Sequence, residues 1–372
     1  MRLLRYVYSR LSEDLMLLAL VLAFLALIAM MPEKWRLLPQ LVEWHTIAIL
    51  AGLMVLSRGL EDSGALAQAG RWLLVHMHSE RRLALAMVLF AALLSAVITN
   101  DVALFIVVPL TVSLGNMARL PIGRLIIFEA LAVNAGSAVS PIGNPQNLFL
   151  WQLSGDSFIT FLLAMLPIAG WMLGVLLLLT AVAFPGRRVD VNMDMTRTYV
   201  HSRLFRVSLL CYPVFLLLVE FGLTLPALAG VLALFLLCWR QVLLGVDWLI
   251  LAIFILMFID LGLLAQLPFM MKVADGLIAL PGGEVTGAAL LSQLISNVPA
   301  AIFLAPFSEQ WYWLAWGVNV GGFGLAIGSL ANLIALRLSR QQGLWVAFHA
   351  WSIPMLFISL LGAYLLLRFV PH

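Results

Sequence analysis

Charged residues are scarce in this sequence. Asp, Glu, Lys and Arg make up only 10% of the 372 residues, whereas 63% are hydrophobic and the mean hydropathy is +1.07. Such a chain has too little polar surface to cover a soluble globular domain. Apolar runs of roughly 20 residues, enough to cross about 30 Å of hydrocarbon, recur from one end to the other. The composition therefore predicts an all-α polytopic membrane protein.

Cysteine, paired histidine and phosphate-loop motifs are also missing. The only cysteines are Cys211 and Cys238, each in an apolar segment, which excludes a disulfide framework and a cysteine metal cluster. The sequence has no phosphate loop and no Ser-His or His-metal arrangement at membrane depth, so we expect neither an ATP-driven pump nor an intramembrane enzyme. We expect no organic cofactor, no transition metal and no nucleic-acid partner.

The apolar segments define the predicted spans. The first of them is read as a retained helix, because no small-residue cleavage site follows it. Two further segments, 83–114 and 285–307, are interrupted by polar residues at mid-length and are predicted to be re-entrant hairpins. The predicted spans are 15–31, 44–59, 121–152 (broken), 158–183, 204–222, 226–240, 247–267, 311–335 (broken) and 349–369.

The basic residues predict the orientation. With a cytoplasmic N-terminus, the opposite side keeps only Lys34, Arg36, Lys272 and Arg368 of the 21 Lys and Arg residues. This is the bias expected from the positive-inside rule. An odd number of predicted crossings separates the two hairpins, so they enter from opposite faces.

Internal repetition supports this inverted arrangement. The pair Ser95 and Thr99-Asn100 in the first hairpin reappears with the same spacing as Ser292 and Ser296-Asn297 in the second. Downstream, the intervals from Asn134 to Gly143 and to Asn147 equal those from Asn319 to Gly328 and to Asn332. Inverted repeats with broken helices are typical of secondary transporters. We therefore predict a first repeat at 1–184, a cytoplasmic linker at 185–202 and a second repeat at 203–372.

The interruptions carry the candidate chemistry. Broken backbone at membrane depth is tolerated only where it faces protein or a water-filled site, and its free carbonyls, amides and hydroxyls can bind ions. Pro141-Ile-Gly143-Asn144-Pro145 cannot continue a regular helix, which makes a break there the favoured interpretation. The predicted cation ligands are Ser95, Asn100, Gly143, Ser292, Asn297 and Gly328. The predicted substrate-facing residues are Thr99, Asn100, Asp101, Asn144, Ser296, Asn297 and Asn332.

Three carboxylates lie deep within apolar segments: Asp101, Glu129 and Asp260. Intramembrane acids are costly and usually functional. Asp101 is the first candidate for proton or cation coupling, because its counterpart in the second hairpin is Val298. Glu129 and Asp260 are further candidates, with hydrogen bonding between helices as an alternative role. Neither hairpin contains Lys or Arg, so an anion would depend on dipoles, amides, hydroxyls and a bound cation.

Four motifs carry a resemblance to a known family. They are Thr99-Asn100-Asp101-Val-Ala, Asn134-Ala-Gly-Ser, Pro141-Ile-Gly-Asn-Pro-Gln-Asn147 and Ser296-Asn297-Val-Pro299. With them the sequence resembles the citrate, arsenite and sodium–proton permease branch of the ion transporter superfamily, over nearly the whole chain. The resemblance implies a bacterial inner-membrane permease, a dimerising scaffold and a transport unit that moves as an elevator.

The resemblance also bears on the substrate. Sodium-coupled dicarboxylate relatives carry Ser-Asn-Thr at each hairpin tip, whereas these tips read Thr99-Asn100-Asp101 and Ser296-Asn297-Val298. The acid at the first tip is similar to the arsenite and sodium–proton members. We expect a secondary transporter of a small anion or oxyanion coupled to Na⁺ or H⁺. Two alternatives stay open, a Na⁺/H⁺ antiporter and an arsenite or antimonite efflux permease.

Overall fold

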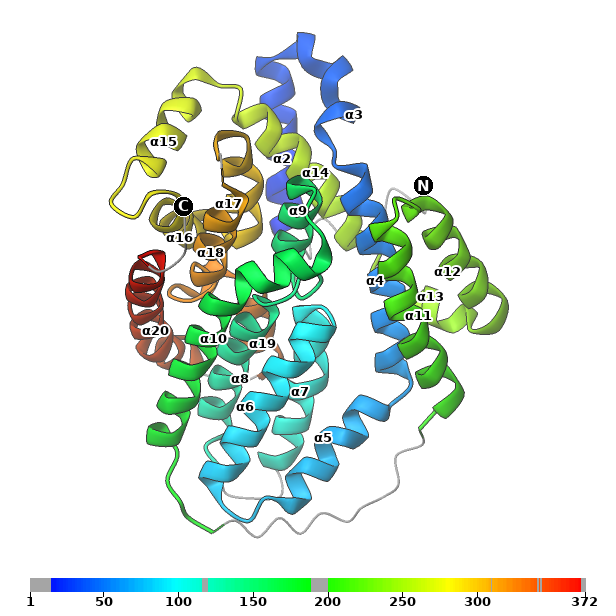
Figure 1. Cartoon of the computed structure of the whole chain (residues 1–372), viewed down its shortest axis with the longest axis vertical. Coiled ribbons are helices and arrows are strands. Elements are labelled where there is room, and N and C mark those ends of the chain that lie inside the picture. The colour runs from blue at the N-terminus through cyan, green and yellow to red at the C-terminus, as the bar shows by residue number, and fades with distance from the viewer. Residues whose placement is uncertain are drawn as a thin grey trace.

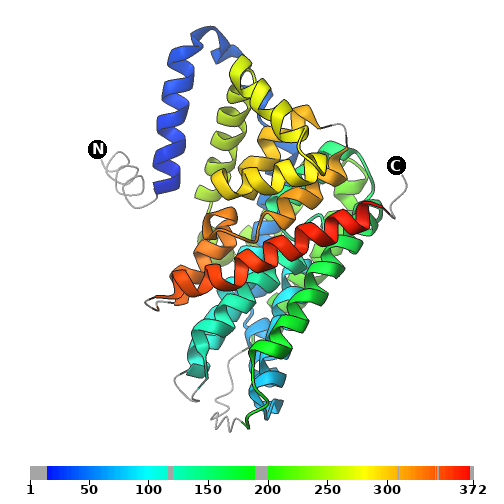
Figure 2. The same cartoon turned by 90° about the vertical axis from the view of Figure 1, so that its left-hand side faces the viewer.

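The described residues of the computed structural model are helical (Figures 1 and 2). They comprise 15–115, 120–188, 200–308, 310–339, 341 and 343–368, and within these ranges no β-strand is present. The predicted all-α class is confirmed. The basic segment Met1–Arg10 and residues 189–199 of the predicted linker lie outside the described residues.

Long apolar helices make this a polytopic membrane protein. Three are long and apolar enough to cross a bilayer: α10 (Phe158–Ala183), α11 (Ser202–Glu220) and α20 (Leu344–Leu367). Two bent pairs, Leu17–Met30 with Pro32–Leu41 and Leu249–Leu264 with Pro268–Ile278, also pass that test. Large apolar side chains on these helices are exposed, as expected where lipid covers them.

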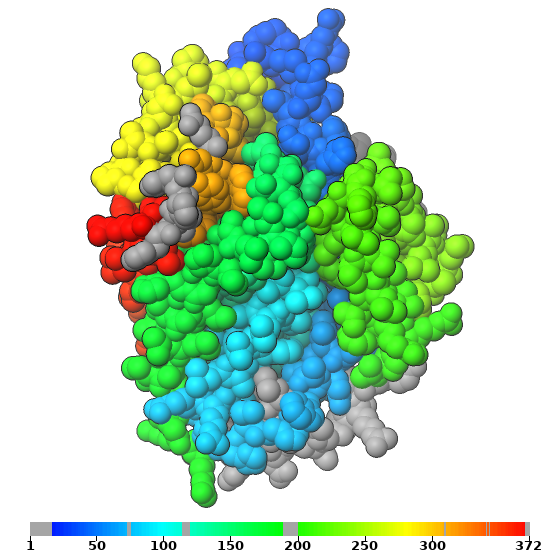
Figure 3. Space-filling model, viewed as in Figure 1, coloured from blue at the N-terminus to red at the C-terminus, as the bar shows by residue number. Residues whose placement is uncertain are grey.

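A block of α4 (Trp44–Asp62), α11 and α12 (Thr224–Cys238) forms one side of the molecule (Figures 1 and 3). Gly52 and Gly59 of α4 leave the space that Phe215 and Ser208 of α11 fill. Small residues allow this close approach between membrane helices, where packing rather than hydrophobic exclusion drives association. A hydrogen bond of 2.8 Å between the Ser57 and Tyr212 hydroxyls joins the same two helices.

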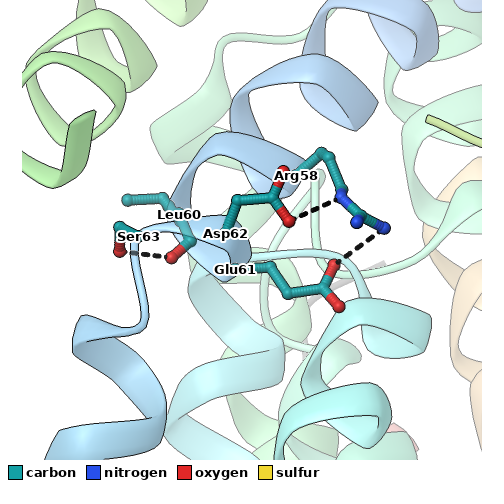
Figure 4. A network of polar contacts seen from close by, with 5 residues as sticks. All are labelled: Arg58, Leu60, Glu61, Asp62 and Ser63. Carbon is teal, nitrogen blue, oxygen red and sulfur yellow. Dashed lines mark hydrogen bonds and ion pairs between the residues drawn. The ribbon is translucent and has the colours of Figure 1, made fainter. Parts of the chain in front are cut away.

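Polar contacts close the end of α4 (Figure 4) and connect it to the residue before α11. Arg58 pairs with Glu61 at 3.9 Å and with Asp62 at 2.9 Å, within the last turn of α4. The Ser63 hydroxyl donates to the Leu60 carbonyl at 2.6 Å, and the Ser63 carbonyl accepts from the His201 amide at 2.9 Å. These bonds end the helix and fix the chain where α11 begins.

Two helical hairpins and two broken helices form the rest of the core. The first hairpin is α6 (Glu80–Val97) with α7 (Asn100–Gly115), in the lower part of Figure 1. The second is α16 (Gly283–Ile295) with α17 (Asn297–Leu304), in the upper part. The broken helices are α8 (Ile122–Ser137) with α9 (Pro145–Ser154), and α18 (Trp311–Val320) with α19 (Leu330–Ser339).

The broken helices cross between the two halves. Helix α19 packs on α7 and α8, and α9 packs on α17 and α18. Helix α10 packs against α20, which runs obliquely across the molecule in Figure 2. Each broken helix therefore completes the packing of the opposite hairpin.

The predicted spans and hairpins correspond to helices, and several short helices were not predicted. The unpredicted ones include α5 (Ala65–His76) and α15 (Pro268–Ile278), which lead into the hairpins and contain Arg71 and Lys272. The remaining elements are α2 (Leu15–Met30), η1 (Pro32–Leu37), α3 (Leu38–Leu41), α13 (Arg240–Gly245), α14 (Leu249–Leu264), η2 (Ala305–Phe307) and η3 (Ala326–Gly328). The division into two repeats and a linker, and the cytoplasmic N-terminus, stay predictions.

Candidate functional site

The first helix break begins where α8 ends at Ser137 and closes at Asn144. The Asn144 side chain accepts the Asn147 amide at 2.8 Å and so caps the N-terminus of α9, with Pro145 in the first helical position. The Asn147 side chain donates to the Ala138 and Ser140 carbonyls at 3.0 and 3.1 Å. The break is thus an ordered loop, and the Asn147 side chain satisfies two of its backbone carbonyls.

The second break runs from Gly321 to Ser329. The Asn332 side chain donates to the Gly322 carbonyl at 2.9 Å. Gln293 of the second hairpin bridges the same segment, because its Nε2 donates to the Gly321 carbonyl and its Oε1 accepts the Leu325 amide, both at 2.8 Å. Here too the freed backbone groups have partners, as burial requires.

Each break lies tightly against its own hairpin. A side chain at Gly136 would collide with the backbone of Ala92, and one at Gly321 would collide with Ser292 and the backbone of Ala289. The hairpins and broken helices therefore touch backbone to backbone near mid-length, where small residues are the only ones that fit.

Asparagine side chains join the two breaks across the centre. Asn134 Nδ2 donates to Asn332 Oδ1 at 2.8 Å, and Asn319 Nδ2 donates to Asn147 Oδ1 at 2.6 Å. A second pair of bonds also joins the two breaks. Ser329 Oγ donates to Asn134 Oδ1 at 3.0 Å, and Asn144 Nδ2 donates to Asn319 Oδ1 at 3.0 Å. All of these side chains are buried.

The first hairpin tip meets the first break through its backbone. The Asn100 amide donates to the Gly143 carbonyl at 2.8 Å, and the Asn100 side-chain oxygen accepts the Asp101 amide at 3.0 Å. Asp101 lies in the first turn of α7, and its carboxylate has no hydrogen-bond or ion-pair partner among the described residues. Thr99 and Asn100 are buried and Asp101 is partly buried.

The second hairpin tip has a strained backbone. Ser296 adopts φ 73° and ψ 157°, a region that glycine occupies far more readily, and it is the one described non-glycine residue with positive φ. Its hydroxyl lies 3.5 Å from Asn297 Oδ1. Strain of this kind is found at ligand sites and switch regions, where surrounding packing maintains it.

The predicted cation-ligand hydroxyls are engaged in helix contacts. Ser95 Oγ lies 3.0 Å from both the Val133 carbonyl of α8 and the Ala92 carbonyl, and its single proton is donated to one or shared between them. Ser292 Oγ donates to the Ala288 carbonyl of its own helix at 2.7 Å. Both side chains are fully buried, beside the breaks that contain Gly143 and Gly328. Their assignment as cation ligands stays a prediction.

The other intramembrane acids lie elsewhere in the core. Glu129 of α8 accepts a hydrogen bond from Thr111 of α7 through Oε1, and its Oε2 has no described partner. Asp260 of α14 is 2% exposed, and neither carboxylate oxygen has a partner among the described residues. Burial of a carboxylate without a hydrogen-bond partner is energetically costly.

A sequence profile of the citrate transporter family, described as "Citrate transporter", matches residues 10–318. This chain belongs to the citrate transporter family. It is accordingly a membrane transporter rather than an enzyme, and its hairpins and breaks belong to a permease.

Relatives of this citrate transporter family member cover most of its length. It is 47% identical to "Inner membrane protein YbiR" of Escherichia coli (strain K12) over 98% of this chain and 96% of that protein. It is 34% identical to "Uncharacterized transporter MJ0456" of Methanocaldococcus jannaschii over 81% and 82%. A shorter match, 33% identical over 140 residues, covers 37% of this chain and 29% of "Silicon efflux transporter LSI3" of Oryza sativa subsp. japonica.

Sequence reasoning missed two kinds of site residue in this family member. Asn134, Asn147 and Asn319 were visible as repeated positions, yet the spacing does not reveal that they bond to each other. Gln293 has no counterpart in the first hairpin, where Ala96 stands in its place, so repetition gave it no weight.

Proposed function

We propose that this chain is a secondary transporter of a small anion or oxyanion, coupled to Na⁺ or H⁺, with its site between the two hairpin tips. The substrate-facing residues in this proposal are Thr99, Asn100 and Asp101 on one side and Ser296 and Asn297 on the other. Asn144 and Asn332 stand in the breaks beside them. Cation ligands come from Ser95, Asn100, Gly143, Ser292, Asn297 and Gly328.

One observation carries the proposal: an unpaired acid lies at the first tip, and residues 83–114 and 285–307, which include both tips, contain no Lys or Arg. Two like charges about 4 Å apart repel by about 4 kcal/mol at an effective dielectric constant of about 20. An anion can therefore enter only after Asp101 has taken up H⁺ or Na⁺. That order of binding couples the movement of substrate to the movement of the cation.

Two further acids extend the coupling proposal. Asp260 is buried without a partner, so it releases a proton only in a conformation that hydrates or pairs it. Glu129 is hydrogen-bonded to Thr111 and fits a structural role equally well. We assign Asp101 the leading role because it alone lies at a hairpin tip.

A second candidate function is efflux of a neutral hydroxide such as silicic or arsenious acid. The partial match to a relative named for silicon efflux favours it, as does the absence of Lys and Arg from residues 83–114 and 285–307. A neutral substrate avoids repulsion by Asp101 and can be held by hydroxyls and amides alone. In this case Asp101 exchanges protons while the hydroxide leaves.

The cellular setting is also part of the proposal. A relative named as an inner membrane protein supports placement in the bacterial inner membrane, with the N-terminus in the cytoplasm as the basic residues predict. We further propose a homodimer in contact with membrane lipid, in which the hairpins move as an elevator against the α4, α11 and α12 block.

The test uses purified protein in proteoliposomes with a pH-sensitive dye inside. Uptake of labelled phosphate, citrate, arsenite and silicic acid is followed with and without imposed Na⁺ and H⁺ gradients. We expect one compound to move only with a gradient, and Asp101→Asn to stop it, whereas the exposed Asp275→Asn in α15 leaves it intact. Proton movement driven by Na⁺ alone, with none of the four compounds transported, would identify an antiporter and refute the anion proposal.

A further inference from the structure

The buried asparagines form a set of reciprocal bonds between the halves. Adding the same interval, 185 residues, takes Asn134 to Asn319, Asn147 to Asn332 and Asn144 to Ser329. Exchanging the halves in this way converts the bond from Asn134 to Asn332 into the bond from Asn319 to Asn147. The bond from Ser329 to Asn134 becomes the bond from Asn144 to Asn319. A two-fold axis between the breaks generates this pattern.

Two of these amides also bond to backbone carbonyls. Asn319 Nδ2 also donates to the Ala315 carbonyl at 2.7 Å, and Asn332 Nδ2 donates to the Gly322 carbonyl at 2.9 Å. Removing one amide leaves its buried partners without hydrogen bonds, which costs more than the bond itself contributes. The network therefore has one satisfied arrangement, and sliding one break past the other would break it.

We propose that this asparagine lock, formed by Asn134, Asn147, Asn319 and Asn332, joins both broken helices into one rigid unit that positions the hairpin tips. The four side chains act through the breaks, and Asn332, which we also place beside the substrate, has this positioning role in addition. Because α19 packs on α7 and α8, and α9 on α17 and α18, the lock holds both hairpins in one body. This inference depends on the chain being a transporter and not on which substrate it moves.

Electron–electron distance measurements between nitroxide labels test the lock without a known substrate. In a background with Cys211→Ser and Cys238→Ser, one label pair replaces Leu89 of α6 and Leu290 of α16, which are exposed on the two hairpins. A second pair replaces Leu89 and Leu237, the latter exposed on α12 in the opposite block. Both pairs are measured in lipid with and without Na⁺, at acid and neutral pH.

With the lock intact we expect one narrow distance distribution for Leu89–Leu290 in every condition. The double change Asn319→Ala with Asn332→Ala should broaden and shift that distribution. Gln146→Ala is the matched control, because Gln146 is a buried amide on α9 whose Oε1 has no described partner. An unchanged Leu89–Leu290 distribution in the double variant, or equal broadening in Gln146→Ala, would overturn the proposal.

Thermal unfolding gives a second measurement if the double variant does not fold. Single changes Asn134→Ser, Asn332→Ser, Asn147→Ser and Asn319→Ser are combined into two double-mutant cycles. We expect the loss in midpoint temperature to be less than additive in both cycles and similar between them. Additive losses in either cycle would show that the paired amides do not act together.

Discussion

The two hairpins follow the same plan and differ in what they carry at the tip. The first tip has an acid, Asp101, and is joined to its break by a backbone bond from Asn100 to Gly143. The second has Val298 in place of the acid, a strained Ser296, and a side-chain bridge from Gln293. At the tips, charge is thus confined to the first hairpin and backbone strain to the second. The division teaches that two hairpins with the same backbone plan can carry different groups at the point where they turn, an acid in one and a strained hydroxyl residue in the other.

Removing the acid from the first tip, or moving it to the second, should have the largest effect on transport. Asp101→Asn removes the titratable group at the first tip, and we expect transport to fall by about a hundredfold or more, as for loss of an essential proton carrier. The double variant Asp101→Asn with Val298→Asp should not recover it, because the second tip is held differently. Recovery in the proteoliposome assay would mean that the two tips are interchangeable.

Adding a methyl group where each broken helix touches its hairpin should have the next largest effect, and it should differ between the two halves. Gly136→Ala meets the backbone of Ala92, whereas Gly321→Ala meets the Ser292 side chain first. Backbone has less room to yield, so we expect Gly136→Ala to cost about 3 kcal/mol of unfolding free energy and Gly321→Ala less. Gly174→Ala on α10 is the control, because an added β-carbon there would meet nothing within 4 Å beyond its own helix backbone. Denaturant unfolding in detergent would measure all three.

Removing the Gln293 bridge should loosen only the second hairpin. Gln293→Ala leaves the Gly321 carbonyl and the Leu325 amide without their side-chain partner, which we expect to cost about 2 kcal/mol. Gln266→Ala is the matched control, since its amide bonds to Gly262 within an exposed turn. Hydrogen exchange should rise in 321–325 and stay unchanged at Gly143. An equal increase in hydrogen exchange at both breaks would show that the Gln293 bridge does not act on the second break alone.

Relieving the strain should have the smallest effect and the opposite sign. Ser296→Gly permits the observed φ of 73° without a side-chain clash, so we expect a gain of about 1 kcal/mol in unfolding free energy. Thr99→Gly at the corresponding position of the first tip should instead destabilise, because Thr99 is not among the residues with positive φ. A loss of stability in Ser296→Gly would show that its hydroxyl contributes more than its backbone costs.

The fold could be predicted well from the sequence because membrane-spanning helices consist of long apolar runs. The spans, the hairpins 83–114 and 285–307 and the broken helices all correspond to helices. Helices α5 and α15 were missed because they are short and carry charge, and so lack the apolar run that predicted the others. The length and hydropathy of a segment identify helices that cross the lipid. They identify less readily the short, charged helices that lead into a hairpin.

The candidate site could be predicted from the sequence only in part. Spacing identified Ser95 and Ser292 as equivalent, yet Ser95 bonds across to α8 and Ser292 bonds within its own helix. Repetition also marked Asn134 and Asn319 without giving their partners. Hydrogen bonds between residues almost 200 positions apart depend on how the helices cross, which no local pattern records.

The lock also has a consequence for how the protein is made. The chain enters the membrane from its N-terminus, so Asn134, Asn144 and Asn147 are inserted before Asn319, Ser329 and Asn332 have been synthesised. Until then their amides lie at membrane depth without their final partners, which favours water or another polar group beside them. The first half is therefore inserted early but matures only when the last helices arrive.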